Sequence, residues 1–158
     1  MTARTPYSVV TEVETPAPVE KRALVQISRE LEREALTAPP EEMAAALQDG
    51  RFLTDRTRAT YAELAARGCR VTLYARGLHT WLAPGVTGVS LDDDDPLLDE
   101  WTVVVPSAEP VVMATIDLRS DSDDLERRFL YAVSRDPHVV QECARLLGAV
   151  PRESASID

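Results

Sequence analysis

Residues 55–74 read DRTRATYAELAARGCRVTLY, and this stretch decides the fold class. Its first part predicts a helix from about residue 55 to 67, ended by Gly68. The buried side of that helix is expected to hold Tyr61, Leu64 and Ala65. Residues 70–74 are rich in β-branched and aromatic side chains and predict a strand. A helix, a glycine turn and a strand in this order form the αβ unit of a layered α/β domain.

Two apolar runs further along the chain predict a strand pair. Residues 101–105 and 111–118 are almost continuously apolar, and only residues 106–110 separate them. Because a link of this length is too short for a parallel crossover, we expect the pair to be antiparallel. With a short strand near residues 86–91, the sequence predicts a single layered α/β domain. Its mixed, partly antiparallel sheet should have about four to five strands flanked by helices.

Helical patterns are predicted in four other segments. Apolar residues recur at helical spacing from about residue 20 to 38, and a short helix is expected between the prolines at 39–40 and Gly50. The pattern also predicts a helix over 123–133 and a last helix over 137–147. The boundaries that follow are a flexible N-terminal tail at 1–19, a domain at 20–150 and a C-terminal tail at 151–158.

Charge and composition exclude some classes of partner. The chain has 158 residues, 27 acids against 17 bases and a net charge of −10. Such an acidic surface repels nucleic acid and anionic membrane, and no apolar run is long enough to span a bilayer. The N-terminus lacks a signal-peptide pattern and two cysteines make no disulfide framework, so we expect a cytoplasmic protein. Lys21 is the only lysine, and every other basic residue is arginine.

The sequence contains no catalytic signature. No phosphate-binding glycine loop, dinucleotide fingerprint or nucleophile elbow is present. His79 and His138 lie far apart, and the four consecutive acids at 92–95 are typical of a solvated loop rather than a calcium loop. We therefore predict no catalytic residues and no metal ligands. The sequence identifies no cofactor.

A candidate ligand site is predicted where the strand at 101–105 begins. Glu100 and Trp101 place a carboxylate and an indole at the edge of the core, where they can orient a ligand. The alternatives are an ion pair between Glu100 and an arginine, and a purely structural Trp101. The full set of predicted ligand-binding residues is Arg58, Tyr61, His79, Trp81, Glu100 and Trp101.

Several segments occur in the order of a known family. They are LVQISRELE at 24–32, the aromatic and Arg-x-x-Tyr segment at 52–61, VTLY at 71–74, PLLDEW at 96–101, Arg-Phe at 128–129 and Ser-x-Asp-Pro-x-Val at 134–139. In this order they resemble the DICT sensory domain of diguanylate cyclases and two-component systems, over about residues 23–147. The chain departs from the family's pattern at 132–134, where an aromatic residue is frequent and Ala-Val-Ser stands here.

The resemblance implies a stand-alone, non-catalytic sensory or regulatory domain, linked to two-component and cyclic-di-GMP signalling. It would bind a small ligand or a signalling partner and act through a separate output protein. One alternative is a ligand-free interaction module, such as a homodimer or scaffold. Another is an enzyme with an unfamiliar carboxylate site, in which Glu100, Asp117 and an arginine would act together.

Overall fold

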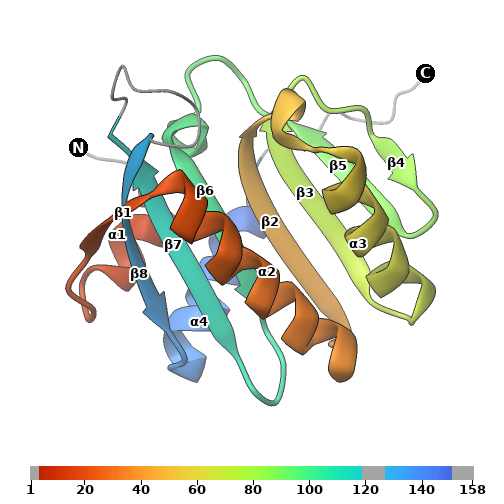
Figure 1. The fold of residues 1–158 in the computed structure, drawn as a ribbon, viewed down its shortest axis with the longest axis horizontal. Helices are drawn as coiled ribbons and strands as arrows, with labels where there is room; N and C mark the ends of the chain where they lie inside the picture. The colour runs from red at the N-terminus through yellow and green to blue at the C-terminus, as the bar shows by residue number, and fades with distance from the viewer. Residues whose placement is uncertain (1–3, 119–126, 151–158) are drawn as a thin grey trace.

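The computed structural model describes residues 4–118 and 127–150 and shows eight strands in one sheet between helices (Figure 1). The α-helices are α1 (Pro6–Val10), α2 (Lys21–Thr37), α3 (Asp55–Ala66) and α4 (Pro137–Gly148), with short 3-10 helices η1 (Gly50–Phe52) and η2 (Pro96–Asp99). The strands are β1 (Ala17–Glu20), β2 (Glu42–Asp49), β3 (Arg70–Arg76), β4 (Trp81–Ala83), β5 (Val86–Ser90), β6 (Glu100–Val105), β7 (Val111–Asp117) and β8 (Arg128–Ser134).

The sheet is mixed, as the sequence predicts. Its strand order is β1-β8-β7-β6-β2-β3-β5-β4. The β2–β3 and β3–β5 pairs are parallel, and the other neighbouring pairs are antiparallel. The predicted antiparallel hairpin is confirmed, with Trp101 opposite Thr115 in β6 and β7. The predicted αβ unit is confirmed as α3 followed by β3.

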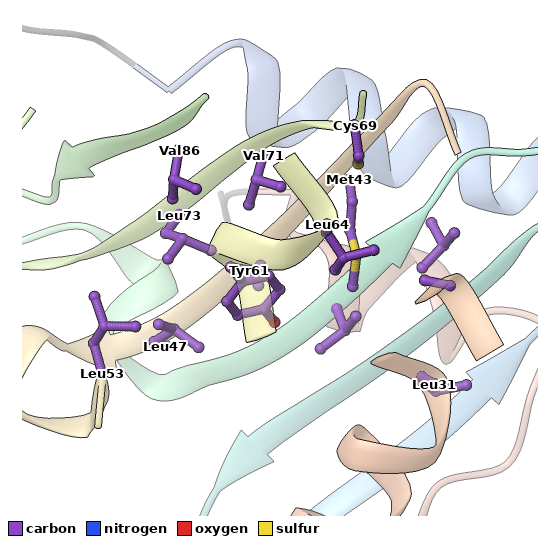
Figure 2. Packing of buried hydrophobic residues seen from close by; sticks show 14 of the residues in the cluster. Leu31, Met43, Leu47, Leu53, Tyr61, Leu64, Cys69, Val71, Leu73 and Val86 are labelled. Carbon is purple, nitrogen blue, oxygen red and sulfur yellow. The ribbon is translucent and has the colours of Figure 1, made fainter. Parts of the chain in front are cut away.

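The helices cover the two faces of the sheet in pairs. Strand residues alternate between the faces, so each strand contributes to two separate cores. On the α2–α3 face, Tyr61 and Leu64 of α3 pack on Met43, Val71 and neighbouring side chains (Figure 2). On the opposite face, α1 and α4 pack on the alternate residues of the same strands. No helix in the described ranges is long and apolar enough to cross a bilayer.

The predicted count of four to five strands is wrong, because two segments expected to be helices are strands and because β1 and β4 were not expected. Residues 42–49 form β2, between β3 and β6 in the middle of the sheet. Its alanines favour a helix locally, but their small side chains are buried between helices on both faces, and tertiary packing overrides propensity. Residues 128–134 form β8, with Phe129 and Ala132 on opposite faces. The proposed start of that helix, 123–126, lies outside the described residues.

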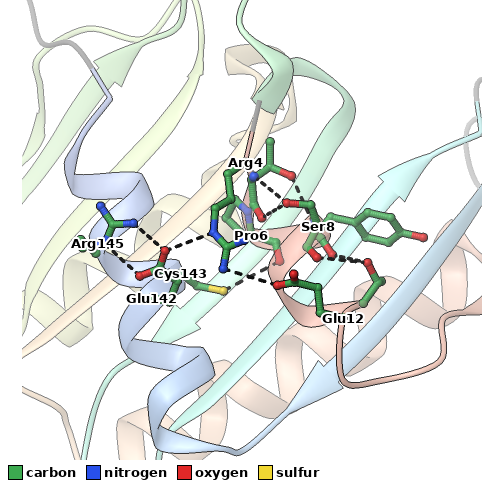
Figure 3. A network of polar contacts seen from close by, with 10 residues as sticks. Arg4, Pro6, Ser8, Glu12, Glu142, Cys143 and Arg145 are labelled. Atoms are coloured by element: carbon green, nitrogen blue, oxygen red, sulfur yellow. Dashed lines mark hydrogen bonds and ion pairs between the residues drawn. The ribbon is translucent and has the colours of Figure 1, made fainter. Parts of the chain in front are cut away.

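The structure also differs from the expected flexible tail at the N-terminus. Residues 6–10 form α1, which Thr5 caps, and β1 pairs with β8 at the edge of the sheet. Val9 and Val10 are buried against α4. Arg4 bridges Glu12 and Glu142 at this contact (Figure 3). Three prolines conceal this order in the sequence, because the helix is short and the strand is an edge strand. The predicted tail at 151–158 lies outside the described residues.

Candidate functional site

A cavity of about 940 Å³ lies between α2 and the start of α3, on the face of the sheet that these helices cover. The end of β2, η1 and Trp101 of β6 complete its walls. Its size falls within the range of small-molecule sites in proteins. The side chains that line it are Lys21, Val25, Ser28, Arg29, Glu32, Arg33, Leu36, Leu47, Gln48, Arg51, Phe52, Thr54, Arg56, Thr57, Thr60, Trp101 and Arg127.

The charge of this cavity is opposite to that of the chain. Six of the lining residues are basic and one, Glu32, is acidic. The whole chain, in contrast, has 27 acids and 17 bases. Helical spacing places Arg29 and Arg33 on one side of α2, and Arg56 faces them from the first turn of α3. Thr54 fixes that turn, because its hydroxyl accepts the backbone N–H of Thr57 at 3.2 Å.

Glu32 is the single carboxylate among the lining residues, and its environment is unusual. It is buried on α2, and burial raises its pKa above the ordinary value. The nearby Tyr61 hydroxyl, Arg29 and other polar neighbours offset part of that rise. The Tyr61 hydroxyl is itself fully buried, and burial together with the charge of Glu32 raises its pKa well above 10.0. Within the described part of the chain this hydroxyl makes no hydrogen bond of ordinary geometry.

One of the residues that line the cavity, Gln48, has a strained backbone. Gln48 has a φ of 71°, a conformation that favours glycine, and it lies where the pairing of β2 with β3 shifts register. Its side-chain amide donates to Asp117 at 3.1 Å and to the carbonyl oxygen of Leu98 at 3.3 Å. Asp117 also forms an ion pair with Arg127. Two hydrogen bonds at the cavity wall therefore stabilise Gln48 in this strained conformation.

Two aromatic rings give the cavity apolar surface. The Phe52 ring is contacted by three cations, of which Lys21 is nearest at 4.5 Å from its centroid. Trp101 lies half-buried in the wall and packs edge-on against Phe129, with ring centroids 6.1 Å apart. Aromatic and aliphatic walls with a charged rim suit a ligand that has both an apolar body and charged groups.

The predicted ligand-binding residues do not gather in one place. Trp101 lines the cavity, and Tyr61 lies in the core behind Glu32. Arg58 donates to the carbonyl oxygen of Leu82 at 3.1 Å and so attaches α3 to β4. His79 and Trp81 are exposed near the sheet edge, and the Trp81 residue is 70% exposed.

Glu100 lies on the opposite face of the sheet from Trp101, because consecutive strand residues alternate. It is 3% exposed, and its carboxylate accepts the backbone N–H of Tyr7 at 3.1 Å. Burial raises the pKa of Glu100 to about 7, although the hydrogen bonds from Thr5 and Tyr7 lower it in part. Asp117, the other carboxylate of the enzyme alternative, contacts Gln48 and Arg127 on the Trp101 face. The two carboxylates therefore lie on opposite sides of the sheet.

Most residues of this cavity were missed from the sequence, because their pattern is spread over four distant segments. Arg29 and Arg33 read as the solvated side of an amphipathic helix, and Arg56 reads as an ordinary first-turn residue. The available signal was the reversal of charge, since α2 and the first turn of α3 carry several bases in an acidic chain. Only the packing of α2 and α3 on the same face brings these bases together.

The described residues also bear on the prediction about metals. No group of three or more histidine, cysteine or carboxylate side chains among them is placed to hold a metal ion. In the acidic run at 92–95, Asp95 caps η2 by accepting the backbone N–H of Leu97 at 2.9 Å. Cys69 and Cys143 are both buried, and burial raises the pKa of the Cys143 thiol to about 12.

Comparison with known proteins gives a family and a fold. The profile of a sensory domain in diguanylate cyclases and two-component systems, DICT, matches residues 7–115. No curated protein matches the chain.

Among solved structures, the chain is similar to polyphosphate kinase from Porphyromonas gingivalis, with a TM-score of 0.58, 13% identity and 99% of this chain covered. The chain spans 29% of the length of that kinase. It is also similar to NucT from Helicobacter pylori, with a TM-score of 0.55, 8% identity, and coverage of 89% of this chain and 99% of that one. At these identities the likeness concerns the fold alone.

Proposed function

The chain belongs to the DICT family of sensory domains, and from this premise we propose that it binds a small ligand in the cavity between α2 and α3. It performs no chemistry on the ligand, and it passes the bound state to a signalling partner. The single observation that carries this proposal is the cavity of about 940 Å³, which combines aromatic walls with a rim of basic side chains. A sensor needs such a site, because a ligand shifts a conformational equilibrium only through contacts that differ between two states.

The fold supplies a physical connection from the cavity to the surface. The first turn of α3 lines the cavity, and Arg58 in the same turn donates to the Leu82 carbonyl of β4. Trp81, the neighbour of Leu82, is 70% exposed on the edge strand. A ligand that shifts α3 would therefore shift β4, so we propose that the surface around Trp81 and His79 contacts the partner.

Native mass spectrometry of the full chain, purified gently from its own host, tests ligand binding. We expect a mass excess that disappears on denaturation. The matched variant is Val25→Trp, which fills the cavity from α2 and should carry no excess. A wild-type protein without excess mass, or an equal excess in both proteins, would contradict a ligand held in this cavity.

Trp101 is expected to contribute more to ligand binding than to folding. Because it is half-buried in the cavity wall, Trp101→Ala should weaken binding more than tenfold and lower the free energy of unfolding by less than about 2 kcal/mol. Urea unfolding and a titration with the retained ligand measure the two effects. Trp81→Ala is the control, and it should leave ligand affinity unchanged. Equal losses of affinity in the two variants would contradict the assignment of Trp101 to the site.

The exposure of Trp81 also favours a second candidate, a ligand-free interaction module. Large aromatic side chains on exposed edge strands are typical of association surfaces. In that case, sedimentation would show a dimer or a stable complex that dissociates in Trp81→Ala, and native mass spectrometry would show no retained ligand. A monomer that retains a ligand would favour the sensory cavity instead.

A further inference from the structure

We propose that the ligand of this cavity is an organic anion with at least two negative charges, carried by phosphate or carboxylate groups on an apolar body. This inference rests on the proposed function, since it names the ligand class of the same cavity. Six basic side chains and one acid line a cavity of a chain whose net charge is −10. So concentrated a positive charge costs free energy through mutual repulsion, and a bound anion would offset that cost.

Four of these basic residues are available for a ligand. In the two described ranges of the chain, Arg29, Arg33, Arg51 and Arg56 form no ion pair, whereas Arg127 is paired with Asp117. Other surface arginines do pair, such as Arg135 with Glu34 and Arg145 with Glu142. Four arginines that form no ion pair within the described residues thus line the same cavity, where Glu32 is the one acidic lining residue.

The identity of these side chains specifies the kind of anion. A guanidinium group is planar and donates two parallel hydrogen bonds, which matches phosphate and carboxylate oxygens. Arg29 and Arg33 are one turn apart on α2, and Arg56 approaches from α3. Arg29 and Arg56 both line the cavity on which Glu32 borders, and both lower the pKa of the Glu32 carboxyl, so their positive charges act on the same part of the site. More than one charged group is needed to use the whole basic rim.

The walls and the overall charge specify the rest of the ligand. The same cavity is also lined by apolar side chains, namely Val25, Leu36, Leu47 and Trp101. An inorganic anion alone would leave this apolar surface exposed to water. The acidic chain repels a long polyanion such as nucleic acid, whose many charges reach beyond the cavity. A small molecule with clustered charges and an apolar body avoids that repulsion and fills both parts of the site.

The experiment titrates the protein with four small probes and a single-stranded oligonucleotide, by calorimetry and by NMR of arginine side chains. Tripolyphosphate and citrate supply charge without an apolar body, adenosine supplies a body without charge, and ATP supplies both. We expect saturable, one-to-one binding of at least one charged probe in the millimolar range or tighter, and none of adenosine. The stronger of tripolyphosphate and citrate distinguishes phosphate from carboxylate. The Nε–H signals of Arg29 and Arg56 should move, and affinity should fall as salt rises.

Variants that are expected to change affinity in opposite directions separate an effect on binding from an effect on folding. Arg29→Gln/Arg56→Gln should weaken binding of the charged probe at least tenfold, and Glu32→Gln should strengthen it severalfold by removing a negative charge. Arg145→Gln, which removes a base on the opposite face, should change affinity less than twofold. Loss of folding cannot produce the gain in Glu32→Gln, so that variant keeps the test informative if the double variant is unstable.

Failure of this inference is distinguishable from failure of the proposed function. If native mass spectrometry finds a retained uncharged or cationic ligand and no charged probe binds, the sensory cavity stands and the anion class is wrong. If charged probes bind equally well to wild type and to Arg29→Gln/Arg56→Gln, they bind elsewhere and the inference is also wrong. Tighter binding of a single-stranded oligonucleotide than of ATP would replace the small anion with nucleic acid.

Discussion

Replacing Gly88 with alanine is expected to lower the free energy of unfolding by about 3 kcal/mol or more. A Cβ at this position of β5 would lie 2.1 Å from the carbonyl oxygen of His79 and 3.1 Å from a methyl carbon of Leu82. The first of these atoms belongs to the backbone, so no side-chain rotation relieves the clash. Either the segment before β4 must move outward or β5 must lose its pairing with β3, where Gly88 lies opposite Leu73. Urea unfolding monitored by circular dichroism measures the loss.

The matched control is Gly148→Ala. Nothing lies within 4 Å of a Cβ built at Gly148, which ends α4. Alanine is the better helix former, so this variant should be as stable as wild type or more stable by about 0.5–1 kcal/mol. A Gly88→Ala protein with wild-type stability would mean that the approach of the His79 carbonyl to β5 is looser than described.

Glu100→Gln is expected to remove a pH dependence of stability worth about 3 kcal/mol. In the folded protein, burial raises the pKa of Glu100 from 4.5 to about 7. The native state therefore binds more protons than the unfolded state between these two values, and wild-type stability falls as pH rises from about 4.5 to 7. Glutamine stays neutral throughout, and its carbonyl oxygen can still accept the Tyr7 N–H. The variant should match wild type near pH 4.5 and exceed it at pH 8.

Urea unfolding at a series of pH values checks this expectation. Asp94→Asn, which changes an exposed carboxylate in the nearby loop, is the control and should leave the pH profile of stability unchanged. A Glu100→Gln profile parallel to that of wild type would show that Glu100 is ionised at no cost in the folded state. A loss of stability in the variant at pH 8 would show that the charge itself holds α1 to the sheet through Tyr7 and Thr5.

The sequence predicted those helices and strands whose own residues favour the conformation that they adopt in the fold. The Asp136-Pro137 start of α4 is confirmed, since the Asp136 carboxylate accepts the His138 N–H at 2.8 Å. β2 could not be predicted in this way, because Ala44, Ala45 and Ala46 favour a helix when read alone. The strand forms because β3 and β6 supply hydrogen bonds on both sides, and that information is distributed along the chain. The family resemblance is confirmed, although the matched region, residues 7–115, begins and ends earlier than the expected 23–147 and excludes the segments at 128–129 and 134–139.

The candidate site was less predictable than the fold. Trp101 was found because an indole beside an apolar strand is conspicuous, but its neighbour Glu100 belongs to the other face of the sheet. A strand alternates its side chains, so adjacency in the sequence argued for separation in space. The basic rim depends on how α2 and α3 lie relative to one another, which no local pattern specifies. The sequence can predict which residues of one helix or strand share a face. It could not predict that residues from four separate segments would line one cavity.

The position of Lys21 makes the cavity chemically addressable. It is the single lysine of the chain, and it lies in the cavity wall with its ammonium group 4.5 Å from the Phe52 ring centroid. A reagent that acylates amines therefore has one side-chain target in this sequence besides the N-terminal α-amine, and that target lies where we propose that the ligand binds. The rate of acylation becomes a direct measure of occupancy, because a bound molecule shields the amine. A fluorophore attached there would report on α2 and η1 together without any engineered cysteine.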